Sequence, residues 1–144
     1  MQTVMRFATS RWKQLSDNTC DGIPSWVIHI VAVADENLID QIAQDDMIRG
    51  YTVACGGFYG PQGRILRADV VDPDQNNKVE SFEYDGMKIC NYEMESSALA
   101  GLAAILGHRA MTCCMVIANR YTTEMNTEYK NSIDTLIQKV LDRI

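Results

Sequence analysis

Residues 91–120 read NYEMESSALAGLAAILGHRAMTCCMVIANR, and this stretch carries the clearest information about the fold. It predicts a helix over Glu95 to Leu106, because small and apolar residues fill it and Gly107 is suited to end a helix. Ala110 to Ala118 follows as a dense apolar run that predicts a strand. A strand that is apolar on both faces is typical of a sheet buried between helices. The stretch therefore predicts an α/β fold.

Helices and strands are expected to alternate along the rest of the chain. Helical spacing of apolar residues follows Asp35 and recurs from Thr127 to Ile144, where Asn126 or Thr127 is the expected cap. We expect one domain over residues 1–144, with a layered mixed β-sheet flanked by helices. The further strands are expected at Thr3 to Phe7, Trp26 to Val33, Gly50 to Cys55 and Arg64 to Val71, and in a hairpin from Val79 to Cys90 that turns at Asp85 and Gly86.

The composition is that of an ordinary globular protein. The 144 residues suffice for one domain with a sizeable core, and 47% of them are hydrophobic. The 13 basic and 19 acidic residues give a net charge of −6, which argues against nucleic acid as a partner and against a basic membrane-binding surface. No apolar run reaches the roughly 18 residues of a membrane span, and no signal peptide is visible. A cytoplasmic protein is expected.

The cysteines and histidines predict no metal site and no disulfide framework. The number of cysteines is odd, and no pair has the C-x-x-C spacing of zinc ligands or redox centres. His29 lies inside an apolar run and His108 follows Gly107, so structural roles are favoured for both. The cysteines are Cys20, Cys55, Cys90, Cys113 and Cys114.

The carboxylates of Glu93 and Glu95 flank Met94 just before the predicted helix, and two interpretations apply to them. Acidic residues are favoured at a helix start because the exposed N–H groups and the helix dipole attract negative charge. A carboxylate can also accept two hydrogen bonds from neighbouring hydroxyls, such as the cis-diol of a ribose. Taken alone, the run fits the helix start better.

A glycine-rich loop over residues 56–63 combines features that suit a planar, amide-bearing ring. Its glycines allow a ligand to approach the backbone, and Phe58 offers a flat apolar face. Gln62 carries a donor beside an acceptor, and Arg64 carries fixed donors for a carbonyl oxygen. Such a set is suited to a pyrimidine, although a surface turn is an equal alternative. In a third stretch, Ile117 to Tyr121, the late strand ends in polar residues, at the end of a strand where ligands of α/β sheets tend to bind. An ordinary exit from strand to loop is the alternative.

These three stretches, in this order, resemble the nucleoside phosphorylase family, and specifically its uridine phosphorylase branch. The matching stretches are residues 57–64, 91–96 and 116–120, and the likeness extends over residues 47–144. Purine-cleaving relatives usually carry an aspartate after the late strand. The amide of Asn119 stands in that region here, which favours the pyrimidine branch.

The resemblance implies a reaction and a role for each residue. Glu95 would bind the ribose hydroxyls, with Met94 beneath the sugar and Glu93 nearby. The base would be held by Phe58, Gln62 and Arg64, with Arg120 acting through water. Glu95, Arg64 and Gln62 are the implied catalytic residues of a phosphate-dependent cleavage of uridine to uracil and ribose 1-phosphate. No cofactor is implied. Inorganic phosphate is the co-substrate, and a homo-oligomer in pyrimidine salvage is expected.

The chain departs from the family in its first part. It resembles the C-terminal half of the family, and the Gly-Asp-Pro phosphate loop of the N-terminal half has no counterpart in it. Residues 6–10 resemble the family's second phosphate element, which implies phosphate contacts for Arg6 and Thr9. Because phosphate needs several fixed donors, two alternatives stay open. In the first alternative the chain is a nucleoside-binding module without turnover. In the second it is a fragment that works only with a partner chain.

Overall fold

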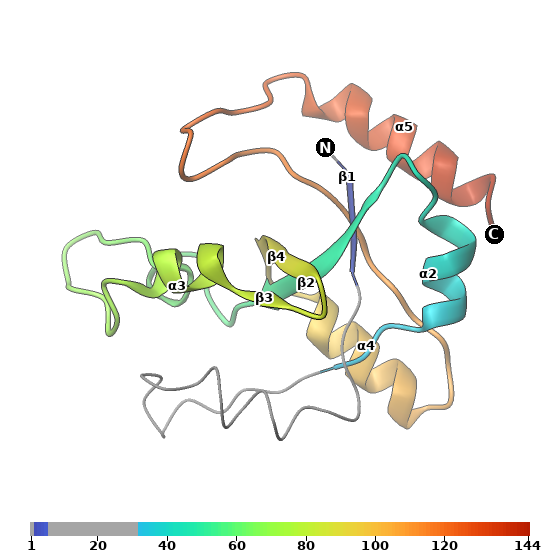
Figure 1. Cartoon of the computed structure of the whole chain (residues 1–144), viewed down its shortest axis with the longest axis horizontal. Coiled ribbons are helices and arrows are strands. Elements are labelled where there is room, and N and C mark those ends of the chain that lie inside the picture. Colours follow the sequence, from blue (N-terminus) through green and yellow to red (C-terminus); the bar gives the residue numbers. More distant parts are fainter. Residues whose placement is uncertain (1, 6–31) are drawn as a thin grey trace.

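The structure is a computed structural model that describes residues 2–5 and 32–144 (Figure 1). It is a mixed α/β fold, as the alternation of patterns predicts. The described elements are β1 (Gln2–Met5), α2 (Glu36–Ile42), β2 (Ile48–Ala54), the 3₁₀ turn η1 (Gly60–Gln62), α3 (Gln75–Ser81), β3 (Glu83–Tyr84), β4 (Met87–Glu93), α4 (Ser96–Ile105), β5 (Cys113–Met115) and α5 (Tyr129–Leu141).

The described strands form one mixed sheet in the order β3-β4-β2-β1-β5. The three central strands are parallel, since β2 pairs with β1 on one side and β4 on the other. The edge strands β5 and β3 run antiparallel to their neighbours. In the pairing of β2 with β4, Ala54 lies opposite Glu93. The loop after β2 and the carboxylate run after β4 therefore leave the sheet at the same edge.

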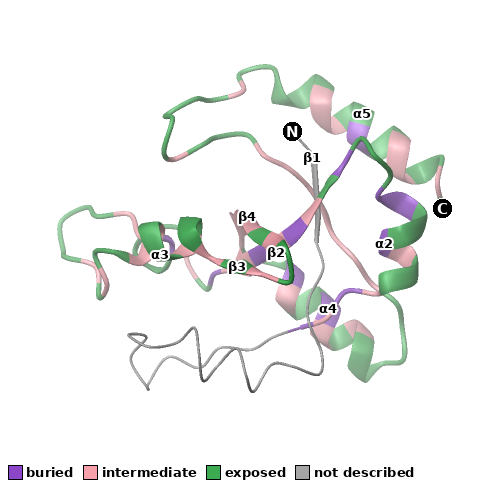
Figure 2. Cartoon of the chain, in the orientation of Figure 1, coloured by how far each residue is buried: buried purple, intermediate pink, exposed green. Residues whose placement is uncertain are grey.

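The core lies where α2 and α5 meet beside the sheet (Figure 2). The helix predicted after Asp35 is confirmed, and the Asp35 carboxylate caps it by accepting the Leu38 N–H at 2.9 Å. Ile39 and Ile42 are buried on one face of α2, and Leu136 of α5 packs into the same cluster. The apolar spacing read from the sequence thus produces the packed pair of helices.

Helices α4 and α5 are confirmed with shifted starts. Helix α4 begins at Ser96, because β4 continues through Glu93. Gly107 follows α4 with φ of 73°, in keeping with its predicted place at the helix end. Helix α5 begins at Tyr129 with Glu128 as its N-cap residue, so the cap predicted at Asn126 or Thr127 is wrong. Asn126 accepts the Glu128 N–H at 3.0 Å in the turn before the helix. None of the helices in the described part of the chain is long and apolar enough to cross a membrane.

The strand predicted over Arg64 to Val71 is wrong. This segment has no regular secondary structure, and its apolar side chains face solvent. Ile65, Leu66 and Val71 are 60%, 66% and 69% exposed. A strand is stabilised by pairing with a neighbour and by packing on one face, and this segment has neither. Apolar content alone therefore misidentified it.

The predicted hairpin is present but shorter than expected. Its turn has the positive φ values of a two-residue hairpin loop, 51° at Asp85 and 73° at Gly86. Val79, expected in the first arm, belongs instead to α3, a helix that the sequence analysis missed. Asp72 could have indicated the start of this helix, because its carboxylate accepts the Asp74 N–H at 3.0 Å just before it.

Two other predicted strands differ from the structure in extent. The late strand was predicted over nine residues, but only Cys113–Met115 form a strand, and Ala118 makes an isolated antiparallel bridge with Met125. The strand predicted from Trp26 lies outside the described residues up to residue 31, and its last two residues, Ala32 and Val33, are not in a strand. The strand predicted from Thr3 corresponds to β1, and its predicted end at Phe7 lies outside the described residues.

Candidate active site

The carboxylate run connects the end of β4 to the first turn of α4, and its two acids have different surroundings. Glu93 accepts the backbone N–H groups of Glu95 and Ser96 at 2.8 and 2.6 Å through Oε2. Its Oε1 accepts the Ser96 hydroxyl at 2.6 Å. Glu93 therefore satisfies donors that a helix start leaves unpaired, and the helix-start interpretation applies to this residue.

Glu95 is exposed beside Met94, which is also exposed. One carboxylate oxygen of Glu95 accepts the Met94 N–H at 3.2 Å. The other Glu95 oxygen lies in the same exposed side chain, so the group retains the capacity to accept hydroxyl donors. Of the two carboxylates, Glu95 is the one whose position leaves it open to a ligand.

The glycine-rich loop closes into a tight turn that buries Gln62. The carbonyl oxygen of Tyr59 accepts the N–H groups of Gln62 and Arg64, both at 3.0 Å. Gly63 adopts φ of 69°, a left-handed conformation that favours glycine. The side chain of Gln62 is 3% exposed and therefore needs internal hydrogen-bond partners.

Two guanidinium groups supply those partners. Arg64 donates to Gln62 Oε1 at 2.7 Å and stacks on the Phe58 ring at 3.8 Å, and it also donates to the Phe58 carbonyl. Arg120 donates to both the side-chain and the backbone oxygen of Gln62. Both arginines therefore converge on one amide oxygen. This arrangement gives the loop a positively charged, donor-rich face.

Arg120 contacts Gln62 although it lies 58 residues further along the chain. Its guanidinium lies 4.3 Å from the centre of the Tyr92 ring. Burial lowers the pKa of Arg120, and the nearby positive charge of Arg64 lowers it further. Asn119 fixes the turn that carries Arg120, since its Oδ1 accepts the N–H groups of Tyr121 and Thr122 at 2.9 and 3.2 Å. The amide oxygen of Asn119 is thus engaged by the backbone.

Cys55 and Tyr92 belong to the site, although the sequence analysis gave neither a role. The Cys55 thiol donates to the Pro61 carbonyl at 3.4 Å, beneath the loop, and burial raises its pKa. Tyr92 supplies the ring under Arg120, and burial raises the pKa of its hydroxyl. In the sequence, only their positions could have indicated a role, because Cys55 precedes the glycine-rich loop and Tyr92 precedes Glu93.

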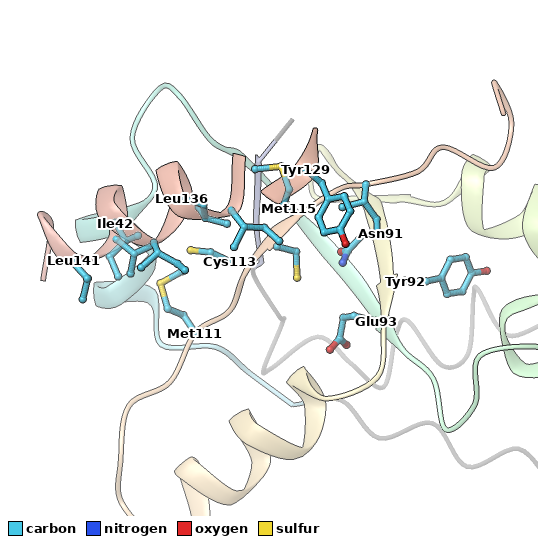
Figure 3. Close-up of a pocket in the computed structure, with 15 residues that line it drawn as sticks. Ile42, Asn91, Tyr92, Glu93, Met111, Cys113, Met115, Tyr129, Leu136 and Leu141 are labelled. Carbon is cyan, nitrogen blue, oxygen red and sulfur yellow. The ribbon is translucent and has the colours of Figure 1, made fainter. Parts of the chain in front are cut away.

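A cavity of about 690 Å³ opens beside the carboxylate run, between β4 and α5 (Figure 3). Its walls are mainly apolar side chains of α5 and β5, and Glu93 and Asn91 form its polar edge on β4. The buried Oδ1 of Asn91 has no hydrogen-bond partner among the described residues. Of the carboxylate run, Glu93 lines this cavity, whereas Glu95 and the cluster of Gln62, Arg64 and Arg120 are not among its lining residues.

The structure places seven of the nine predicted site residues. Phe58, Gln62, Arg64 and Arg120 form one cluster, and Glu93, Met94 and Glu95 lie at the end of the neighbouring strand β4. Arg6 and Thr9, the predicted phosphate ligands, lie outside the described residues.

The model of the Phosphorylase superfamily matches residues 13–144, and the chain belongs to that superfamily. This finding confirms the resemblance drawn from the motifs. No curated protein matches the chain.

Solved structures similar to this chain show the same fold. A nucleoside phosphorylase from Trypanosoma brucei, described as showing uridine phosphorylase activity, aligns with a TM-score of 0.83 and 21% identity over 99% of this chain. A uridine phosphorylase from Phytophthora capsici aligns with a TM-score of 0.60 and 15% identity over 96% of this chain. Isoform 2 of the Schistosoma mansoni uridine phosphorylase aligns with a TM-score of 0.54 and 23% identity over 78% of this chain.

The chain spans only part of each of these proteins. It covers 57% of the trypanosomal, 55% of the oomycete and 42% of the schistosomal protein. The similarity therefore defines the fold of the region that the chain contains.

Proposed function

We propose that this chain carries the base-binding and sugar-binding part of a uridine phosphorylase site. The reaction is the phosphate-dependent cleavage of uridine to uracil and ribose 1-phosphate. The observation that carries this proposal is the convergence of Arg64 and Arg120 on the buried Gln62, one strand away from Glu95.

The base is the leaving group, and the cluster is suited to it. As the glycosidic bond breaks, negative charge develops on the uracil ring and its carbonyl oxygens. Fixed donors close to that charge stabilise the transition state without having to reorganise. Arg64 and Arg120 supply those donors, and the proposed contact of Gln62 with the ring is made by its side-chain nitrogen, because both arginines donate to its oxygen. The flat face of Phe58 supports the ring itself.

The sugar is held at the end of β4. Glu95 accepts hydrogen bonds from the two ribose hydroxyls, and Met94 packs beneath the sugar. Glu93 contributes indirectly, because it fixes the backbone of Glu95. Holding the ribose against the base-binding cluster aligns the glycosidic bond for attack.

Phosphate is the attacking co-substrate, and we propose Arg6 and Thr9 as its ligands. Catalysis in this scheme rests on positioning and charge stabilisation, with no cofactor. We further propose that the chain works as a homo-oligomer in the cytoplasm.

A uracil-release assay with and without phosphate tests the proposal. Phosphate-dependent release is expected, and it should fall at least about tenfold in the Glu95→Ala variant, because a charge-assisted hydrogen bond is lost. Glu80→Ala, which removes an exposed carboxylate from α3, is the matched control and should behave like the parent. Equal release by the parent and Glu95→Ala would refute the assigned role of Glu95.

Nucleoside binding without turnover is the second candidate function. It is favoured by the share of the relatives that the chain spans, 57% in the trypanosomal case, since a partial phosphate site still leaves the base and sugar contacts in place. Calorimetry that detects uridine binding, together with no release of uracil, would select it. Release that appears only after a second polypeptide is added would instead identify a fragment that needs a partner chain.

A further inference from the structure

Asn76, in the first turn of α3, contacts three segments that are distant in the sequence. Its side-chain N–H donates to the Gly63 carbonyl at 3.3 Å, and its side-chain oxygen accepts the Tyr92 hydroxyl at 3.2 Å. Its backbone carbonyl accepts the hydroxyl of Tyr121. One amide residue thus joins the loop, β4 and the segment after β5.

The loop is held on both sides of Gln62. Gln75 donates to the Pro61 carbonyl at 2.8 Å, and Asn76 donates to the Gly63 carbonyl. The Asn76 amide also packs closely on the loop, since a Cβ atom at Gly63 would lie 2.7 Å from the Asn76 side-chain nitrogen. Consecutive side chains of α3 therefore fix the backbone that carries Gln62.

Asn76 is also connected to Arg120, through the side chains of Tyr92 and Tyr121. The centre of the Tyr92 ring lies 4.3 Å from the Arg120 guanidinium. The Tyr92 hydroxyl donates a hydrogen bond to the Asn76 side-chain oxygen. Tyr121 adjoins Arg120 in the chain and also reaches Asn76. Gln62 and Arg120 come from segments 58 residues apart, and the residue that follows each of them in the chain is hydrogen-bonded to Asn76.

We propose that Asn76 is a positioning residue that sets the placement of Gln62 against Arg120, and through it the affinity for the pyrimidine base. The inference rests on the proposed function for the identity of the ligand. Asn76 acts through the loop and through Tyr92, without contacting the base itself. Its removal leaves the donors present but loosens their relative placement.

Three variants test this inference. Asn76→Ala removes both side-chain contacts. Tyr92→Phe keeps the ring under Arg120 but removes the hydroxyl that reaches Asn76. Asn77→Ala is the matched control, because Asn77 is an exposed neighbour whose side chain donates to Asp74 within its own turn. Two measurements apply to each variant: hydrogen exchange of the Gln62 and Arg64 amides, and calorimetric affinity for uracil.

Faster exchange of these two amides is expected in Asn76→Ala, with exchange in α5 unchanged. Uracil affinity should fall about three- to tenfold in Asn76→Ala, the scale of one or two lost hydrogen bonds. In a turnover assay the KM for uridine should rise while the KM for phosphate stays constant, which a general loss of stability would not produce. The Tyr92→Phe change should add little to Asn76→Ala, because both interrupt the same link.

Parent-like exchange and parent-like uracil affinity in Asn76→Ala would overturn the inference. If Asn76→Ala fails to fold, Tyr92→Phe decides it by the same two measurements. If the parent chain binds no uracil, the proposed function fails on that result, while faster exchange at Gln62 in Asn76→Ala would still support the positioning of the loop. Equal effects of Asn76→Ala and Asn77→Ala would also overturn it.

Discussion

At the scale of single residues, the two carboxylates of the Glu-Met-Glu run divide two tasks between them. Glu93, at the end of β4, binds the start of α4 by accepting two backbone N–H groups and a hydroxyl. Glu95 has one backbone contact and an exposed side chain. The helix-start interpretation therefore applies to Glu93, and the ligand interpretation is compatible with Glu95.

Substitution separates these tasks. Glu93→Ala is expected to lower the free energy of unfolding by about 1 kcal/mol or more, the scale of the hydrogen bonds that are lost. Glu95→Ala should change stability by less than about 0.5 kcal/mol, as is usual for an exposed site, and should weaken uridine binding. Urea unfolding followed by circular dichroism gives the first quantity, and calorimetry the second. A larger stability loss in Glu95→Ala than in Glu93→Ala would reverse the assignment.

At the scale of elements, an ion cluster fastens the end of α5 to the segment after α2. Arg143 contacts both carboxylate oxygens of Asp46, at 3.0 and 2.9 Å, and Lys139 reaches one of them at 2.6 Å. Arg143 also donates to the Ile42 carbonyl at 2.8 Å. The cluster therefore aligns the two helices whose apolar faces form the core.

This cluster predicts part of the acid sensitivity of the fold. Hydrogen bonds from Arg143, then Lys139, hold the pKa of Asp46 well below its ordinary value. A depressed folded-state pKa stabilises the fold above the unfolded-state pKa of about 4, and the contribution is lost as pH falls toward the folded-state pKa. Asp46→Asn should therefore show a smaller loss of stability between pH 6 and pH 3 than the parent. Urea midpoints at the two pH values measure this, and identical losses would contradict it.

Local signals account for the elements that the sequence predicted well. Asp35 caps α2 through its own side chain, and the turn at Asp85 and Gly86 follows from their backbone preferences. Pairing and burial are not local. The exposed run from Arg64 therefore appeared strand-like although no neighbour pairs with it.

In the candidate site, too, local features were predictable from the sequence and long-range contacts were not. Gln62, Arg64 and Glu95 were selected from residue chemistry and resemblance, and the structure brings Gln62 and Arg64 together. The bonds from Arg120 to Gln62 cross 58 residues, so no spacing rule could supply their geometry. Asn76 was missed because its role depends on three remote segments.

At the scale of the whole molecule, α4 has an apolar face toward solvent. Exposed apolar side chains recur along it at helical spacing, and Ile105 is 81% exposed. Contiguous apolar surface of this kind marks association sites in folded proteins. The exposed apolar side chains on this helix are Leu99, Leu102, Ile105 and the adjoining Leu106.

We expect the chain to self-associate through this surface. Ile105→Glu should raise the dissociation constant at least about tenfold, because it places a charge where apolar contact forms. Asn77→Glu adds the same charge on exposed α3 and should leave association unchanged. Sedimentation equilibrium over a range of protein concentrations measures both. A parent chain that stays monomeric throughout would contradict the expectation.

The parallel pairing of Ala54 with Glu93 has a consequence for how such a site diversifies. The chain leaves β2 at this edge, forms the loop and α3, and returns by the β3–β4 hairpin to the same edge. The loop and α3, together with Gln62 and Arg64, thus form one contiguous segment between two fixed anchor points, while Arg120 joins the cluster from outside it. Under the proposed function, exchanging that segment would replace the part of the base-binding cluster that Gln62 and Arg64 form, while Arg120, Glu93 and Glu95 keep their places.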